Sequence, residues 1–149
     1  MKFIVEANLG KLAKELRMLG YDTVYDRGKD AQTLIHRARQ EERVILTRNK
    51  GRTPEAPEIQ VIQVTEADPL RQLEGLLRQG IIILHDPNLF SRCLLCNTRL
   101  EEINREEARG KVPDYIYQHH RAFHRCPECH RLYWPGTHLE RMKKRLGLF

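Results

Sequence analysis

No apolar stretch in this 149-residue sequence approaches the length needed to cross a lipid bilayer. The sequence also lacks internal repeats and low-complexity tracts, and its Met-Lys start runs directly into a strand-like segment without the form of a secretory signal. What is present is 40% hydrophobic residues, enough for at least one globular core. We therefore expect a cytoplasmic globular protein with no membrane segment, built as one ordinary domain or two small ones.

Acidic residues are scarce in the second part of the sequence. Residues 91–149 carry 12 Lys and Arg against 7 Asp and Glu, whereas residues 1–90 carry 14 against 13. Most of the formal charge of +6 therefore lies in the C-terminal part of the sequence. Residues 91–149 thus have a net charge of +5, and they also contain the four cysteines of the chain. If these bound one Zn²⁺ as thiolates, the net charge of this part would fall to about +3. The remaining positive charge favours a polyanion such as nucleic acid, although mildly basic surfaces are also common in proteins that bind none.

The sequence opens with a short apolar run that ends on the carboxylate of Glu6. Such a run is typical of a buried parallel strand, and ligands bind beyond the carboxyl ends of these strands. Residues 9–19 then carry apolar side chains at helical spacing, which predicts a helix capped by Asn8. That spacing leaves three cations on the accessible face of the helix: Lys11, Lys14 and Arg17.

Strand-like and helix-like segments alternate as far as residue 84. Apolar runs predict further strands at residues 21–25, 44–46, 59–64 and 81–84, and helical spacing predicts helices that begin after Asp30 and at residue 69. This alternation predicts an α/β fold, a parallel sheet flanked by helices. Because the composition changes near residues 85–88, we expect an α/β domain at residues 1–86 and a small zinc-ribbon domain at residues 87–149.

The second region contains two Cys-x₂-Cys pairs, Cys93 with Cys96 and Cys126 with Cys129, separated by 29 residues. Two such pairs supply the four thiolates of a closed, structural Zn²⁺ site, and the long separation predicts an insertion at residues 101–110. The alternatives are disulfides, which a reducing cytoplasm disfavours, a redox motif and an iron–sulfur cluster. If zinc is bound, we expect its loss to unfold the region after residue 90 and to spare residues 1–84.

Polar residues can meet at one edge of the predicted sheet: Glu6 after the first strand, Asp30 at the start of the second helix and the run Thr47-Arg48-Asn49 after the third strand. The candidate site residues among them are Glu6, Asp30 and Asn49. If they converge, two carboxylates and an amide oxygen suit Mg²⁺ or Mn²⁺. Five nearby cations could then hold phosphates, namely Lys11, Arg17, Arg48, Lys50 and Arg52. A helix-capping Asp and a loop Asn also have ordinary structural explanations, and the residues alone do not separate the two interpretations.

Residues 3–23 read Phe-Ile-Val-Glu-x₂-Leu-Gly-Lys-Leu-Ala-x₂-Leu-Arg-x-Leu-Gly-Tyr-Asp-Thr, and Asp30 and Ile-Leu-Thr-Arg-Asn at residues 45–49 follow. In these residue types and their spacing, residues 3–49 resemble the Mut-seven C-terminal domain family, a branch of the PIN-like ribonucleases. The second Cys pair, followed by Tyr-Trp-Pro-Gly-Thr-His at residues 133–138, is similar to the terminal zinc ribbon of that family. The resemblance therefore covers nearly the whole chain.

This resemblance implies an α/β/α PIN-like fold whose acidic cluster binds a divalent metal and activates water to cleave RNA. Asp30 matches the second acid of the family pattern, whereas Glu6 and Asn49 stand where the pattern has Asp. Glu for Asp keeps the charge and lengthens the side chain by one methylene. Asn for Asp removes a negative charge and leaves a weaker ligand.

Two functions follow from this reading. The first is a metal-dependent ribonuclease in which Glu6, Asp30 and Asn49 are the catalytic residues. The second is a catalytically weak or inactive module that binds RNA or a ribonucleoprotein through its basic ribbon. A third possibility is an adaptor that binds only proteins. The ribbon would hold phosphates through six cations, Arg121, Arg125, Arg131, Lys143, Lys144 and Arg145, with stacking by Tyr133, Trp134 and His138.

Overall fold

The protein is described by a computed structural model that covers residues 1–28, 30–49, 58–84 and 88–147. Its first part is a four-stranded parallel sheet in the order β2-β1-β3-β4, made of β1 (Phe3–Glu6), β2 (Thr23–Asp26), β3 (Val44–Thr47) and β4 (Val61–Gln63). The short helix η1 (Ala7–Leu9) leads into α1 (Gly10–Met18), and α2 (Ala31–Glu41) and α3 (Pro69–Arg78) follow. The predicted α/β fold is confirmed. Within the described ranges no helix is long and apolar enough to cross a membrane.

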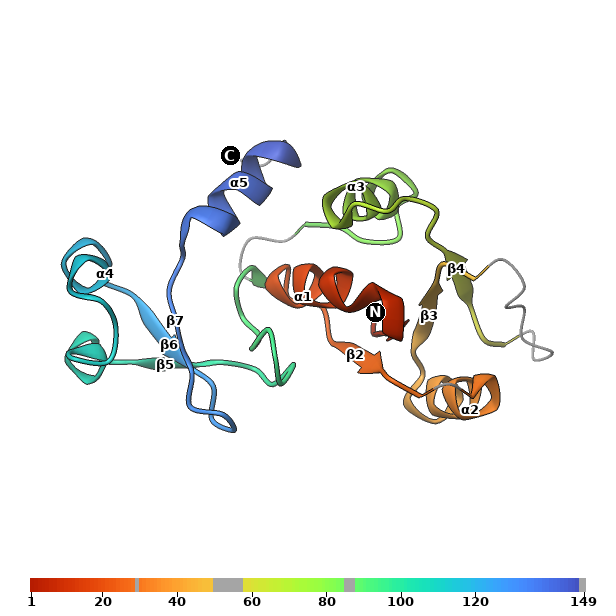
Figure 1. Cartoon of the computed structure of the whole chain (residues 1–149), viewed down its shortest axis with the longest axis horizontal. Coiled ribbons are helices and arrows are strands. Elements are labelled where there is room, and N and C mark those ends of the chain that lie inside the picture. Colours follow the sequence, from red (N-terminus) through yellow and green to blue (C-terminus); the bar gives the residue numbers. More distant parts are fainter. Residues whose placement is uncertain (29, 50–57, 85–87, 148–149) are drawn as a thin grey trace.

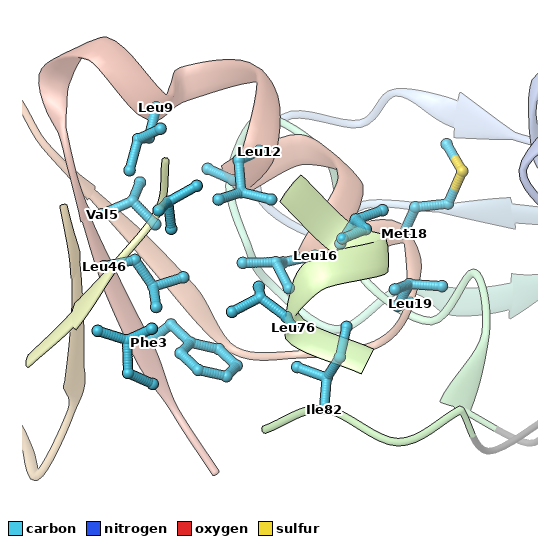
Figure 2. Packing of buried hydrophobic residues seen from close by; sticks show 14 of the residues in the cluster. Phe3, Val5, Leu9, Leu12, Leu16, Met18, Leu19, Leu46, Leu76 and Ile82 are labelled. Carbon is cyan, nitrogen blue, oxygen red and sulfur yellow. The ribbon is translucent and has the colours of Figure 1, made fainter. Parts of the chain in front are cut away.

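Helices cover both faces of the sheet (Figure 1). Because successive strand residues point to opposite faces, Phe3 and Val5 of β1 pack on one side with the leucines of α1 and α3 (Figure 2). Ile4 points the other way and packs with Leu34 of α2. The first three residues of β1 are fully buried, which explains why they form a continuous apolar run.

The second part is a three-stranded antiparallel sheet in the order β5-β6-β7, formed by β5 (Glu101–Ile103), β6 (Phe123–Arg125) and β7 (Leu132–Tyr133). The helices η3 (Arg105–Ala108) and α4 (Asp114–His119) lie between β5 and β6 in the chain. A small core around Phe123, Ala108 and Val112 holds this part together. The segment 101–110 is thus not simply an insertion, because its first residues form β5.

The helix α5 (Thr137–Arg145) returns to the first part of the molecule (Figure 1). Its buried residues Leu139 and Met142 belong to the same apolar cluster as α1 and α3. Arg145 adds ion pairs to Asp68 and Glu74, at 3.1 and 3.0 Å. Through α5, the second part of the chain therefore contributes to the core of the first.

Two local predictions are wrong. Residues 81–84 form no strand; they follow the end of α3, where Ile82 is buried in the core and the Tyr21 hydroxyl bonds to the backbone of Ile83. Asn8 does not cap α1, because it lies within η1, and the residue before α1 makes no side-chain capping bond. Asp30 does cap α2, as predicted.

Asp22 joins the two parts through a half-buried charge. Its Oδ1 accepts a hydrogen bond from Arg43 at 2.8 Å and another from the side-chain amide of Asn97 at 2.7 Å. Burial alone would raise the pKa of Asp22, but these two donors lower it below the ordinary 3.8. The carboxylate is therefore stabilised in the folded protein.

Replacing Asp22 with Asn should lower the free energy of unfolding by about 1–3 kcal/mol at neutral pH, because the buried side chain of Arg43 then keeps only one of its two charged acceptors, Glu41. A depressed folded pKa gives stability that is present above the unfolded value and is lost as the pH falls through the folded one. The difference between wild type and D22N should therefore be constant from about pH 5 to about pH 8. Urea unfolding at several pH values measures it, and equal stability of the two proteins at neutral pH would contradict this account.

Candidate functional site

Glu6 and Asn49 lie at the carboxyl ends of two adjacent parallel strands, β1 and β3, where Thr47 links them. The Thr47 hydroxyl donates to Oε2 of Glu6 at 2.9 Å and accepts from the backbone N–H of Asn49, also at 2.9 Å. Thr47 is only 1% exposed, so this hydroxyl is fixed by packing. The sequence predicts Thr47 at this edge, but its link to Glu6 depends on the pairing of β1 with β3, for which the sequence gives no local signal.

Asp30 lies at the same edge of the sheet because α2 begins just after β2, the other neighbour of β1. Its Oδ1 accepts from the backbone N–H of Gln32 and its Oδ2 from the hydroxyl of Thr33, both at 3.0 Å. These contacts of the carboxylate lie within its own helix, so Asp30 acts as the N-cap of α2. The side chain is exposed and accessible from solvent.

A further carboxylate, Asp26, stands at this edge and was not predicted as a site residue. It ends β2 and is the register partner of Glu6 across the parallel pair. Its Oδ1 accepts from the backbone N–H of Gly28 at 3.0 Å. The signal in the sequence was a second acid directly after an apolar run, the predicted strand at residues 21–25.

Three carboxylates therefore share the edge, from Glu6, Asp26 and Asp30, but they do not form a compact cluster. In the described part of the chain, one group of three or more Asp, Glu, His or Cys side chains is close enough together to hold a metal ion. It consists of the four cysteines, whose ligand atoms lie within 4.8 Å of one another. At the acidic edge, an ion would have to draw on fewer protein ligands and on oxygens of water or phosphate.

The predicted phosphate-binding cations divide into three groups. Lys11 on the first turn of α1 and Arg48 after β3 are exposed, and both flank the acidic edge. Lys50 and Arg52 lie outside the described residues. Arg17 is different, because its side chain is buried.

The expectation that Arg17 is accessible is wrong. Only 8% of the residue is exposed, and its Nε donates to the carbonyl of Thr23 at 2.9 Å. Its Nη1 donates to the carbonyls of Leu94 and Leu95, at 2.6 and 3.3 Å. Arg17 therefore ties α1 and β2 to the loop that carries the first cysteine pair, a role for which its distant partners give no local sequence signal.

The four cysteines are brought together as predicted. All are free thiols, their sulfurs lie within 4.8 Å of one another, and the Sγ atoms of Cys93 and Cys129 are 3.7 Å apart. A tetrahedral ion with metal–sulfur bonds of about 2.3 Å places its sulfurs about 3.8 Å apart. The donor set and its spacing therefore fit Zn²⁺ with no open position for water.

Each cysteine pair sits in the same backbone turn. The N–H of Cys96 points to Sγ of Cys93 at 3.3 Å, and the N–H of Cys129 points to Sγ of Cys126 at 3.5 Å. The next residues, Asn97 and His130, both adopt a left-handed conformation with φ of 65°. The two loops are thus equivalent halves of one metal site.

Tyr133 supports the site from β7. Its hydroxyl lies 3.0 Å from Sγ of Cys93 and accepts from the N–H of Leu94 at 3.2 Å. Burial alone would raise the pKa of Cys93, but hydrogen bonds from Tyr133 and from the amides of Cys96 and Leu95 lower it to about 7. This thiol is therefore readily ionised, as a metal ligand must be.

Asn97 connects the metal site to the first part of the molecule. Its side-chain oxygen accepts from the backbone N–H of Thr23 at 3.0 Å, and its amide donates to Asp22. Arg92 adds a bond from its Nη1 to the carbonyl of Asn97 at 2.8 Å. The metal-binding loop is thus hydrogen-bonded to the start of β2 on one side and to Arg92, just before Cys93, on the other.

The basic residues of the second part are not equally available. Arg125 pairs with Glu101 at 3.4 Å, and Arg145 pairs with two acids of the first part. His138, proposed for stacking, bonds to Glu15 at 2.9 Å. Arg121, Arg131 and Lys144 are exposed, whereas Lys143 is half-buried.

Comparison with known proteins adds one finding. A family model described as Mut7-C RNAse domain matches residues 1–146, a range that includes both the acidic edge and the four cysteines. Comparisons with curated proteins and with solved structures gave no match.

Proposed function

The chain belongs to the Mut7-C RNAse domain family, and from this premise we propose that it is a metal-dependent ribonuclease of the PIN-like type. Family membership supports RNase-like function and RNA as the substrate. The finer proposal places the chemistry at Glu6, Asp30 and Asn49. Its main support is the buried Thr47 hydroxyl, which holds Glu6 beside the backbone of Asn49 at the end of the two central strands.

A divalent ion fits the chemistry of this edge. Glu6 and Asp30 offer carboxylates, Asn49 offers an amide oxygen, and Mg²⁺ is typically bound by one or two carboxylates together with substrate phosphates. When bound, Mg²⁺ or Mn²⁺ would activate water and neutralise charge on the phosphate. The open spacing of the acids suits an ion that also takes ligands from RNA.

The exposed cations at this edge would orient the substrate. Lys11 and Arg48 can contact phosphates on either side of the scissile bond and balance the negative charge that develops there. Lys50 and Arg52 belong to this proposal on the evidence of the sequence alone. Arg17 does not, because its guanidinium already donates to three backbone carbonyls.

We assign cleavage to residues 1–86 and RNA binding mainly to residues 87–149, with one structural zinc ion in the second part. The four-cysteine shell leaves zinc no role in activating water. A cytoplasmic location suits this arrangement, because reducing conditions keep the thiols available for zinc.

An assay on the zinc-loaded protein tests the proposal. Mn²⁺ or Mg²⁺ should be required for cleavage of single-stranded or structured RNA, and the double variant Glu6→Ala/Asp30→Ala should lose the activity while it keeps its zinc and its fold. RNA binding should weaken as salt rises, because phosphate contacts release counterions. Cleavage that survives in the double variant would show that the activity does not need Glu6 and Asp30 and would refute the site. Salt-sensitive binding without cleavage would instead favour the RNA-binding module.

A further inference from the structure

Two adjoining cavities run along the boundary between α1 and the second part of the molecule. One has a volume of about 490 Å³. Its lining includes Gly10 and Tyr25 of the first part of the chain and Leu94 and Leu95 of the second. The other, of about 530 Å³, continues from Leu94 and Leu95 to Trp134. Because both share Lys14 and these two leucines, they form one continuous groove.

The groove is lined by cations and contains no carboxylate among its described lining residues. Its exposed cations come from both parts of the chain and are Lys11, Lys14, Arg27, Lys111 and Arg131. None of these five forms an ion pair with a described residue, in contrast to Arg125 and Arg145. Unpaired positive charge on both walls favours a polyanion that runs along the groove.

The floor of the groove is apolar and aromatic. Leu95 is 45% exposed, and Leu94 and the half-buried Trp134 lie beside it. Trp134 packs against the buried Phe123 in a T-shaped contact, at 6.3 Å between ring centroids, so the indole is held in place while it also lines the cavity. A rigid aromatic ring next to unpaired cations suits an unstacked base and its phosphate.

One end of the groove lies next to the acidic edge. Gly10 and Lys11 begin α1, which follows Glu6 after the single turn of η1. The Tyr25 hydroxyl donates to the carbonyl of Ala7, and Tyr25 precedes Asp26, the register partner of Glu6. A chain lying in the groove would therefore leave it beside the carboxylates.

We propose that this groove holds single-stranded RNA, with phosphates on Lys14 and Lys111 and a base on Trp134, and leads it from the ribbon to the carboxylates. The inference rests on the proposed function, since it assumes that RNA is the substrate. A duplex keeps its bases stacked inside and cannot offer one to Trp134, so the groove selects single strands.

The single tryptophan of the chain provides a direct readout. In the zinc-loaded protein without Mn²⁺ or Mg²⁺, an unlabelled RNA oligonucleotide of about 12 nucleotides should quench Trp134 emission, and a duplex of the same sequence should not. The double variant Lys14→Glu/Lys111→Glu should bind a labelled strand at least about tenfold more weakly, with a salt slope lower by about two.

Arg71→Glu/Arg78→Glu is the matched control, because it makes the same charge change at exposed positions of α3 outside the groove. It should change affinity by about twofold or less. If RNA is bound and cleaved but Trp134 emission does not change and the two double variants behave alike, the groove is wrong and the proposed function stands. If polyglutamate quenches as well as RNA does, the assignment to RNA is overturned. If no RNA is bound or cleaved, both proposals fail.

Discussion

Removal of zinc is expected to unfold the whole chain in a single transition. The sequence alone predicted that residues 1–84 would survive this treatment, but the structure shows a shared core, to which α5 contributes Leu139 and Met142. Arg17 and Asn97 also anchor the first metal-binding loop to α1 and β2. If the loop loses its ion, these contacts lose their fixed partners.

The expected effect is large. Structural zinc sites contribute about 10–16 kcal/mol of apparent binding free energy, whereas a domain of ordinary size is stable by only about 5–15 kcal/mol. Chelation, or the variant Cys126→Ser, should therefore leave little folded protein at room temperature. Circular dichroism and amide exchange measured separately for residues 1–84 and for residues after 90 would follow the loss in both parts.

The matched control is His130→Asn, which changes the residue next to Cys129 without removing a ligand. Asn tolerates the left-handed conformation at this position, so the variant should bind zinc and unfold like wild type. Native amide protection that persists in residues 1–84 after chelation would contradict the shared-core account. A protein purified without metal, with no loss of structure on chelation, would contradict the zinc site itself.

Asn49→Asp is expected to raise both metal affinity and cleavage. The residue follows Thr47, whose hydroxyl contacts Glu6, so a carboxylate here would add a negative charge beside the one already present. Affinity for hard cations increases with the charge of the ligands. We expect Mn²⁺ to bind about tenfold more tightly, which corresponds to about 1.4 kcal/mol, and RNA cleavage to increase by a similar factor or more.

Calorimetric titration of Mn²⁺ into zinc-loaded wild type and N49D measures the change. Asn88→Asp, at an exposed position in a different loop, makes the same change in charge and should have no effect. Asp30→Ala should abolish binding in both backgrounds, and adding Glu6→Asp to N49D tests whether the shorter acid is the better ligand. Equal and negligible heats for wild type and N49D would refute the metal site and favour an RNA-binding module.

The main elements of the fold could be predicted because they depend on local patterns. A continuous apolar run identified β1, and helical spacing identified α1, α2 and α3 to within a few residues. The paired Cys-x₂-Cys motifs identified the ligands, which the structure brings together. These signals lie within short segments of the chain, and for this reason they can be read without a structure.

The errors concern contacts between distant segments. Residues 81–84 have the composition of a buried strand, but Ile82 is buried by packing on the end of α3 and not by a neighbouring strand. Arg17 lies among cations on a helix, yet two of its three partners are carbonyls 77 and 78 residues further along the chain. The role of Thr47 likewise depends on the side-by-side placement of β1 and β3.

The place of α5 in the core also sets the order of events during synthesis. Leu139 and Met142 complete the apolar cluster around α1, so this cluster cannot close until residue 142 has left the ribosome. Nascent chains usually fold from the N-terminal end as domains emerge. Here the leucines of α1 and α3 would stay partly uncovered until α5 has emerged, and a ribosome stalled between residues 90 and 135 would display them to chaperones.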